Sequence, residues 1–238
     1  MSLLLPHEHM LGRVAQALDA DLRAEIAFVG GCVTALHITD PVTRSAVRLT
    51  DDVDAILHVM GKGPWYQLME RLQRLGFRIS LEDDITCRTR LRDGEGPELI
   101  VDFMPDDPAI LGFSNRWYPD ALKTASPYML PNGLEIRVVD PPHFVGTKLE
   151  AFKGRGNDDL LGSRDIEDLL NIVDGRESLL NELKTAAYDL RSYAGERLHE
   201  LLLHSEIGYA VQSTAMGNPA REDLIFDRLE RLAALRDS

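Results

Sequence analysis

The sequence predicts an α+β fold, with strands and helices in the first part of the chain and helices alone in the second. Two observations predict it. Short apolar runs bounded by turn residues, such as 26–29 and 53–59, are typical of buried strands and alternate with helical patterns. Further along the chain the apolar spacing is helical only. We therefore expect two domains, the first over residues 1–140 and a helical second one over residues 141–238.

Local signals justify the individual elements. Gly30 and Gly31 predict a turn after an apolar run, Pro64 suits the first turn of a helix, and Gly76 suits its C-terminal cap. Five prolines between residues 105 and 131 predict a loop-rich stretch. The expected strands cover 26–29, 53–59, 77–80, 86–92, 98–104 and 134–139, with a hairpin turn at 93–97. The expected helices cover 6–25, 33–38, 64–75, 144–152, 163–174, 178–203 with a break, and 221–235.

The composition of the 238-residue chain, 44% hydrophobic, is that of a globular protein. A formal net charge of −13 argues against a duplex-DNA partner, because binding phosphates over a broad surface requires a basic stripe. Charges interrupt every apolar run before the ~20 residues that span a bilayer, and the first residues lack the basic flank of a signal peptide. The two cysteines, Cys32 and Cys87, have no metal-type spacing. Together these features predict a cytoplasmic protein without a membrane partner.

Two aspartates flank one apolar residue on a predicted strand. Side chains two apart on a strand project from one face, so Asp52 and Asp54 point the same way while Val53 packs inward. Two anions held so close repel each other unless a cation lies between them. Carboxylate oxygens suit a hard divalent cation, Mg²⁺ or Mn²⁺. The alternative is a polar strand end in water, which is the ordinary interpretation of an Asp-x-Asp pair taken alone.

A third aspartate, Asp102, lies in the apolar run 98–104, where a lone charge is costly to bury. If that strand pairs beside 53–59, three carboxylates converge. Upstream, Gly30 and Gly31 form a turn without Cβ atoms, at which backbone N–H groups can approach a phosphate; a tight strand-to-helix turn is the alternative. This order of elements fits two-metal phosphoryl or nucleotidyl transfer.

These residues resemble the motifs of a known family. Gly30-Gly31, Asp52-Val53-Asp54 and Asp102 are similar to those of the nucleotidyltransferase superfamily with a DNA polymerase β-like palm. The closer resemblance is to the AbiEii/AbiGii-type toxin nucleotidyltransferases of bacterial toxin–antitoxin systems. The segments that carry it are 29–36, 49–54, 101–105, 147–156 and 163–169. The resemblance implies a palm-like mixed sheet flanked by helices, followed by a helical C-terminal domain.

The resemblance also implies a reaction. A hydroxyl attacks the α-phosphate of a nucleoside triphosphate, the nucleotide is transferred, and pyrophosphate leaves. Asp52 and Asp54 would hold the metals, and Asp102 would ligate the metal near the attacking hydroxyl and help take its proton. Gly30, Gly31 and Cys32 would contact the nucleotide. Cys32 stands where family members often carry Ser or Thr, and a thiol is a weak donor.

Charged residues of the second domain are further candidates for nucleotide binding. Lys148 suits the β/γ-phosphates as a point charge, and Arg155 is a phosphate candidate of the same kind; a surface helix lysine is the alternative for Lys148. Asp165 and Asp168 share a helix face, where capping and a salt bridge to Lys148 explain the pair as well as catalysis does. We assign Asp165 to the nucleotide site and Asp168 to structure.

Three functions follow for comparison. The first is a toxin-like enzyme that transfers a nucleotide to tRNA, with a cognate antitoxin as a partner. The second keeps the chemistry but transfers to a cationic small molecule of the aminoglycoside kind, which the net charge of −13 would steer toward the protein. The third, motivated by Cys32, is a catalytically weakened module that binds a nucleotide or an antitoxin. The stripe formed by Arg88, Arg90 and Arg92 is interpreted either as an RNA or triphosphate contact or as an edge strand protected by charge.

Overall fold

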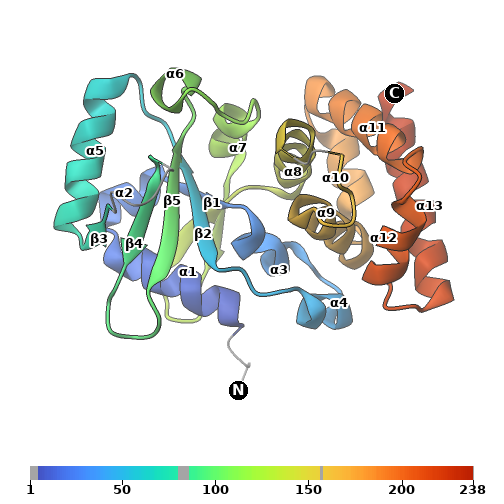
Figure 1. The fold of residues 1–238 in the computed structure, drawn as a ribbon, viewed down its shortest axis with the longest axis horizontal. Coiled ribbons are helices and arrows are strands. Elements are labelled where there is room, and N and C mark those ends of the chain that lie inside the picture. Colours follow the sequence, from blue (N-terminus) through green and yellow to red (C-terminus); the bar gives the residue numbers. More distant parts are fainter. Residues whose placement is uncertain (1–4, 80–85, 156–157, 238) are drawn as a thin grey trace. The chain divides into compact units, whose positions relative to one another are not determined.

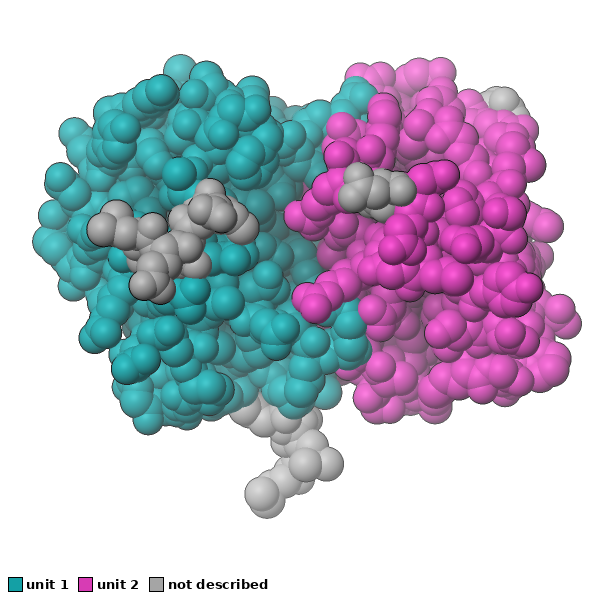
Figure 2. Space-filling model, in the orientation of Figure 1, with its two compact units in different colours: residues 1–33, 48–140 teal, residues 34–47, 141–238 magenta. Residues whose placement is uncertain are grey.

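The computed structural model describes residues 5–79, 86–155 and 158–237 (Figure 1). The chain forms two compact units, and Figure 2 shows both: unit 1 comprises residues 1–33 and 48–140, and unit 2 comprises residues 34–47 and 141–238. Unit 1 contains the sheet, and unit 2 is helical, so the architecture is α+β, as the sequence predicts. None of the described helices combines the length and apolarity needed to traverse a bilayer.

A mixed sheet forms the frame of unit 1. The described residues supply these strands: β1 (Ala27–Val29), β2 (Asp52–Leu57), β3 (Phe77–Arg78), β4 (Arg88–Leu91), β5 (Leu99–Pro105), β6 (Ser126–Met129) and β7 (Glu135–Val138). They lie in the order β3-β4-β5-β2-β1-β7-β6. β2 runs parallel to β5 and β1 runs parallel to β7, whereas the other neighbours are antiparallel. The predicted strand over 77–80 ends early at Arg78, and residue 80 lies outside the described residues.

The central strands are held by a continuous apolar core. Val53 and Ala55 of β2 are fully buried, as is Phe103 of β5. The ring of Phe103 meets that of Phe77 edge to face, with centroids 5.3 Å apart. Burial of such side chains is the main stabilising term in folding, so β2 and β5 lie at the stable centre of unit 1.

The helices of unit 1 are α1 (Pro6–Ala17), α2 (Ala20–Glu25), α5 (Lys62–Arg74), α6 (Pro108–Leu111) and α7 (Tyr118–Thr124), with a 3₁₀ turn, η1 (Gly31–Val33). The prediction of one helix over 6–25 is wrong, because the Asp19 side chain accepts a hydrogen bond from the Leu22 amide and begins a second helix. The stretch over 105–131 also holds more structure than predicted. Asp107 caps α6 in the same way, and proline stands in the first turn of both α6 and α7.

Unit 2 consists of helices: α3 (Thr34–His37), α4 (Pro41–Ala46), α8 (Pro141–Arg155), α9 (Arg164–Gly175), α10 (Leu179–Thr185), α11 (Tyr188–Leu202), α12 (Ile207–Thr214), α13 (Pro219–Ala233) and the 3₁₀ turn η2 (Ala234–Asp237). The break expected within 178–203 separates α10 from α11. The helices α4 and α12 were not predicted. Asp40 caps α4 by accepting a hydrogen bond from the Thr43 amide, a local signal that marks its start.

Residues 34–47 belong to unit 2, whereas the sequence analysis assigns them to the first domain. The amides of Thr39 and Asp40 both donate to the carbonyl of Gly175, at the end of α9. Arg221 of α13 then links Asp174, at 2.7 Å, to Asp40, at 3.0 Å. The long sequence separation of these contacts explains why local patterns did not reveal them.

Acid should break an ion pair that connects α1 to the turn between β4 and β5. Arg13 is buried and donates two hydrogen bonds to Asp93, in the turn between β4 and β5. These hydrogen bonds lower the pKa of Asp93 to about 2 in the folded chain. Since the unfolded value is about 3.9, this stabilisation is complete above that pH and disappears as the pH falls toward 2.

We therefore expect Asp93→Asn to lower the free energy of unfolding by about 2 kcal/mol at pH 7. Urea denaturation should show the difference between wild type and variant shrinking between pH 4 and pH 2. Asp120→Asn, which removes an exposed partner of Lys123, serves as control and should change little. A difference that does not depend on pH would contradict the assignment.

Candidate metal centre

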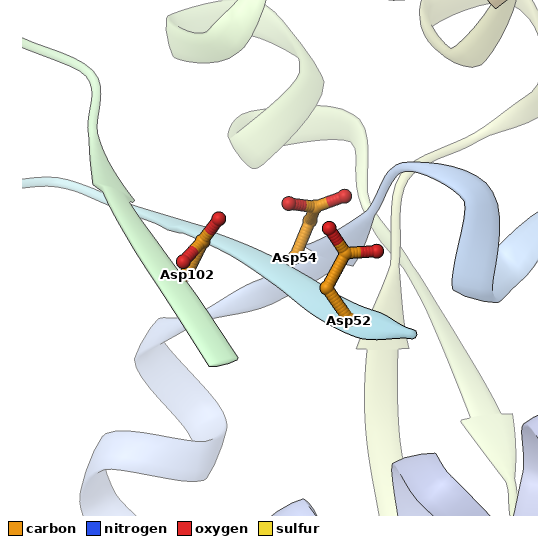
Figure 3. A group of neighbouring side chains, drawn as sticks. All are labelled: Asp52, Asp54 and Asp102. Atoms are coloured by element: carbon orange, nitrogen blue, oxygen red, sulfur yellow. The ribbon is translucent and has the colours of Figure 1, made fainter. Parts of the chain in front are cut away.

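Three carboxylates meet on one face of the sheet in unit 1. Asp52 and Asp54 project from β2 and Asp102 projects from β5, and Figure 3 shows the three side chains on the same side of the strands. Each offers an oxygen, and these oxygens all lie within 4.8 Å of one another. The convergence predicted from the spacing in the sequence is therefore present.

The register of the strands explains this convergence. Asp54 lies directly beside Asp102 in the parallel pairing of β2 with β5, and Asp52 is two residues before Asp54 on the same face. The neighbours of these aspartates on each strand point the other way into the core, where Val53 and Val101 are fully buried. A slip of one residue would turn the carboxylates into the core, so burial of the apolar set fixes the site.

The donor set fits a hard cation. Three carboxylates supply only oxygen ligands, as Mg²⁺ and Mn²⁺ prefer. Asp52 and Asp54 are half-buried and Asp102 is buried, so their mutual repulsion is screened less than it would be in water. A divalent cation would relieve that repulsion.

Arg88 supplies a positive charge to this cluster. It lies on β4, directly opposite Asp102 of β5. Its Nε donates to Oδ1 of Asp102 at 2.9 Å and its Nη2 donates to Oδ2 at 2.8 Å. Such a two-point pair matches the planar guanidinium to the carboxylate. The sequence analysis saw Arg88 only as part of a basic stripe, because the residue opposite it depends on strand register.

The rest of that stripe is also paired. Arg90 and Arg92 both approach Glu98, at 3.6 Å and 3.3 Å. The stripe thus consists of side chains in acid–base pairs. The edge-strand interpretation is wrong, because β4 lies between β3 and β5 in the sheet.

Gly30 is required by the geometry of the site. It follows β1, and its φ of +78° lies in the left-handed region that favours glycine. A Cβ atom at this position would come within 1.9 Å of Oδ2 of Asp54. The turn therefore allows the backbone to pass directly beside a carboxylate of the cluster.

The residues after Gly30 form a 3₁₀ turn and a short helix. The predicted helix over 33–38 is present as the four-residue α3, and the 3₁₀ turn Gly31–Val33 precedes it. Gly31 is buried, and Cys32 is fully buried with its thiol donating to the Val29 carbonyl at 3.1 Å. The side chain of Cys32 is thus engaged inside the protein, and the short helix offers little of the dipole expected to attract a phosphate.

Cys87, which the sequence analysis did not connect to the site, lies next to the carboxylates. Burial raises the pKa of its thiol to about 12, and the charges of Asp102 and Asp54 add to the effect. The thiol therefore stays protonated at neutral pH. Among the described residues, the group whose ligand atoms lie within 4.8 Å of one another consists of the three aspartates.

The predicted nucleotide-binding residues Lys148, Arg155 and Asp165 all belong to unit 2. The Nζ of Lys148 lies 3.2 Å from Asp165 and 2.6 Å from Asp168, and all three side chains are buried. Arg155 contacts Asp165 at 3.2 Å, and its side chain is 75% exposed. The surface-lysine alternative is wrong for Lys148, whereas the predicted salt bridge to the aspartate pair is present.

Comparisons with known proteins identify no family for this chain. No family model matches the sequence, and no curated protein matches it. The carboxylate cluster and the residues that resemble the nucleotidyltransferase motifs are therefore the features that bear on function.

We expect Gly30→Ala to cost more stability than Gly112→Ala. Both glycines have φ near +80°, but a Cβ at Gly112 meets nothing within 4 Å. The control should therefore lose only the backbone term of about 1 kcal/mol, and Gly30→Ala should lose about 2 kcal/mol more through its clash with Asp54. Chemical denaturation measures both, and equal losses would show that the close approach is relaxed at no cost.

Lys148→Met should destabilise unit 2 by about 3–5 kcal/mol, because it leaves two buried aspartates without their central cation. Arg155→Met is the matched control, since its exposed pair with the same Asp165 should contribute at most about 1 kcal/mol. Thermal unfolding of the full-length variants makes the comparison. A mild loss for Lys148→Met would argue that the lysine is kept for a ligand instead.

Proposed function

We propose that the protein is a metal-dependent nucleotidyltransferase. It moves a nucleoside monophosphate from a triphosphate to a hydroxyl acceptor, and pyrophosphate is released. The observation that carries the proposal is the meeting of Asp52, Asp54 and Asp102 within 4.8 Å beside the Gly30 turn. These are the residues that resemble the catalytic motifs of the AbiEii/AbiGii-type toxin nucleotidyltransferases.

The proposed roles follow from the positions of the side chains. Asp52 and Asp54, on one face of β2, hold Mg²⁺ or Mn²⁺, and Asp102 joins them from β5. When bound, the cation supplies positive charge that offsets the charge of the phosphate oxygens in the transition state. Asp102 is also the candidate to accept the proton of the attacking hydroxyl. Gly30 lets the backbone of the turn pass directly beside Asp54, where any side chain would collide with the Asp54 carboxylate.

The residues of unit 2 enter the proposal through the resemblance. Lys148 and Asp165 are enclosed in a buried ion-pair network, whereas the exposed guanidinium of Arg155 is accessible to a phosphate. Arg155 is therefore the first residue of this set to test for triphosphate binding, with Lys148 in the role of fixing Asp165.

The acceptor is proposed to be tRNA, with an antitoxin as a protein partner, as the resemblance suggests. A cationic small molecule is the second candidate, because the net charge of −13 attracts positively charged acceptors over long range. A module that binds a nucleotide without turnover is the third, favoured by the two-point engagement of Asp102 with Arg88.

An assay with α-labelled triphosphates distinguishes these candidates. The full-length protein is incubated with each triphosphate and Mg²⁺, alone, with total tRNA, or with an aminoglycoside. Label on tRNA together with released pyrophosphate supports the first candidate, and label on the aminoglycoside supports the second. If the protein binds a triphosphate but releases pyrophosphate under none of these conditions, the proposal of an enzyme is wrong and the third candidate is supported.

Asp54→Asn should lower the rate of label transfer at least about a hundredfold, because it removes a ligand of the catalytic cation without changing side-chain volume. The matched control is Asp51→Asn, which removes the same charge from an exposed neighbour outside the cluster and should leave the rate within about twofold. Equal rates in the two variants at saturating Mg²⁺ would refute the assignment of Asp54.

A further inference from the structure

Arg88 gives the carboxylate cluster a cation of its own. Its guanidinium donates to both oxygens of Asp102, and the two side chains are only 22% and 10% exposed. Asp102 is at the same time within 4.8 Å of ligand oxygens of Asp52 and Asp54. One carboxylate therefore belongs both to an ion pair and to the candidate metal centre.

The strand itself sets the face of the sheet from which Asp102 projects. The side chain of aspartate is short, and Asp102 stands on β5, which is paired with β4 on one side and β2 on the other. Neighbouring Val101 and Phe103 are fully buried and fix the direction of that strand face. The need that Arg88 meets is electrostatic, since it offsets one of three formal negative charges held close together.

We propose that Arg88 competes with the metal ion for Asp102 and thereby sets the metal affinity of the centre. The inference deepens the proposed function and rests on its metal site. Without a divalent cation, Arg88 stabilises the three carboxylates. When a cation binds, the guanidinium gives up at least part of its contact with Asp102, because two positive charges at one carboxylate repel each other. Asp52 and Asp54 are then the first ligands of the cation. Asp102 becomes the third ligand when its ion pair with Arg88 is weakened.

A residue that hydrogen-bonds to a metal ligand usually has the opposite role, which is to orient that ligand for the metal. A partner that orients a ligand raises metal affinity, and its removal weakens binding. The two roles predict opposite signs for the same substitution, so the direction of the change decides between them.

Mn²⁺ titration by calorimetry of the full-length protein is the test. We expect Arg88→Gln to bind Mn²⁺ about five- to tenfold more tightly than wild type, since a competing charge is removed. Arg90→Gln is the matched control: it is on the same face of β4, two residues away, and pairs with Glu98 outside the cluster. Its Mn²⁺ dissociation constant should stay within about twofold of wild type. In the Asp102→Asn background, Arg88→Gln should have no further effect, because the competition acts through Asp102.

Thermal unfolding supplies a second readout. In EDTA, Arg88→Gln should unfold at a lower temperature than wild type, because Asp102 loses its counter-charge. Saturating Mn²⁺ should raise the unfolding temperature of the variant more than that of wild type, because the ion replaces the missing charge. Arg88→Lys, which keeps the charge but loses the two-point contact, should lie between the two and serves if Arg88→Gln does not fold.

Each outcome bears on the inference. Tighter Mn²⁺ binding by Arg88→Gln but not by Arg90→Gln supports it. Weaker binding by Arg88→Gln overturns it and makes Arg88 an orienting residue, and equal binding overturns it by showing that Arg88 has neither role. Both results leave the proposed nucleotidyltransferase standing. Absence of Mn²⁺ binding in wild type and in every variant overturns the metal centre itself.

Discussion

Mutual repulsion among three carboxylates is the constraint that the surroundings of the candidate metal centre in unit 1 must meet. Asp52, Asp54 and Asp102 lie together because strand register and the burial of their neighbours leave them no other direction. Two unusual features beside the cluster accommodate these charges. A glycine with positive φ makes room for Asp54, and Arg88 offsets charge at Asp102. A protein gains nothing in stability from such a cluster, so its presence on a rigid sheet favours a site for a ligand.

In unit 2, the buried acids lie in ion-pair networks between helices. Lys148 is enclosed by Asp165 and Asp168, and Arg221 joins Asp174 to Asp40. In these networks each acid contacts a basic group on another helix, and the ion pairs connect the helices. In unit 1, by contrast, three carboxylates offer oxygens within 4.8 Å of one another, an arrangement that can hold a cation.

The sequence revealed the features that depend on short-range periodicity. Alternation on a strand predicted that Asp52 and Asp54 share a face, and the apolar run around Asp102 predicted a buried strand. Features set by pairing were not accessible. The residue opposite Arg88 follows from strand register, and the docking of 34–47 follows from contacts with Gly175 and residues of α13. Three local signals were available and missed: Asp19, Asp40 and Asp107 each begin a helix by capping it.

The chain leaves unit 1 after Val33 and returns at Arg48, shortly before the strand that carries Asp52 and Asp54. During synthesis the excursion over 34–47 emerges long before Gly175 and Arg221, the groups that bind it. Its docking cannot be complete until the chain as far as Arg221 has left the ribosome. Folding of unit 2 is thus complete only when the early segment 34–47 has docked. A gene fragment that begins at residue 141 would encode a helical bundle without α3 and α4, which belong to that unit.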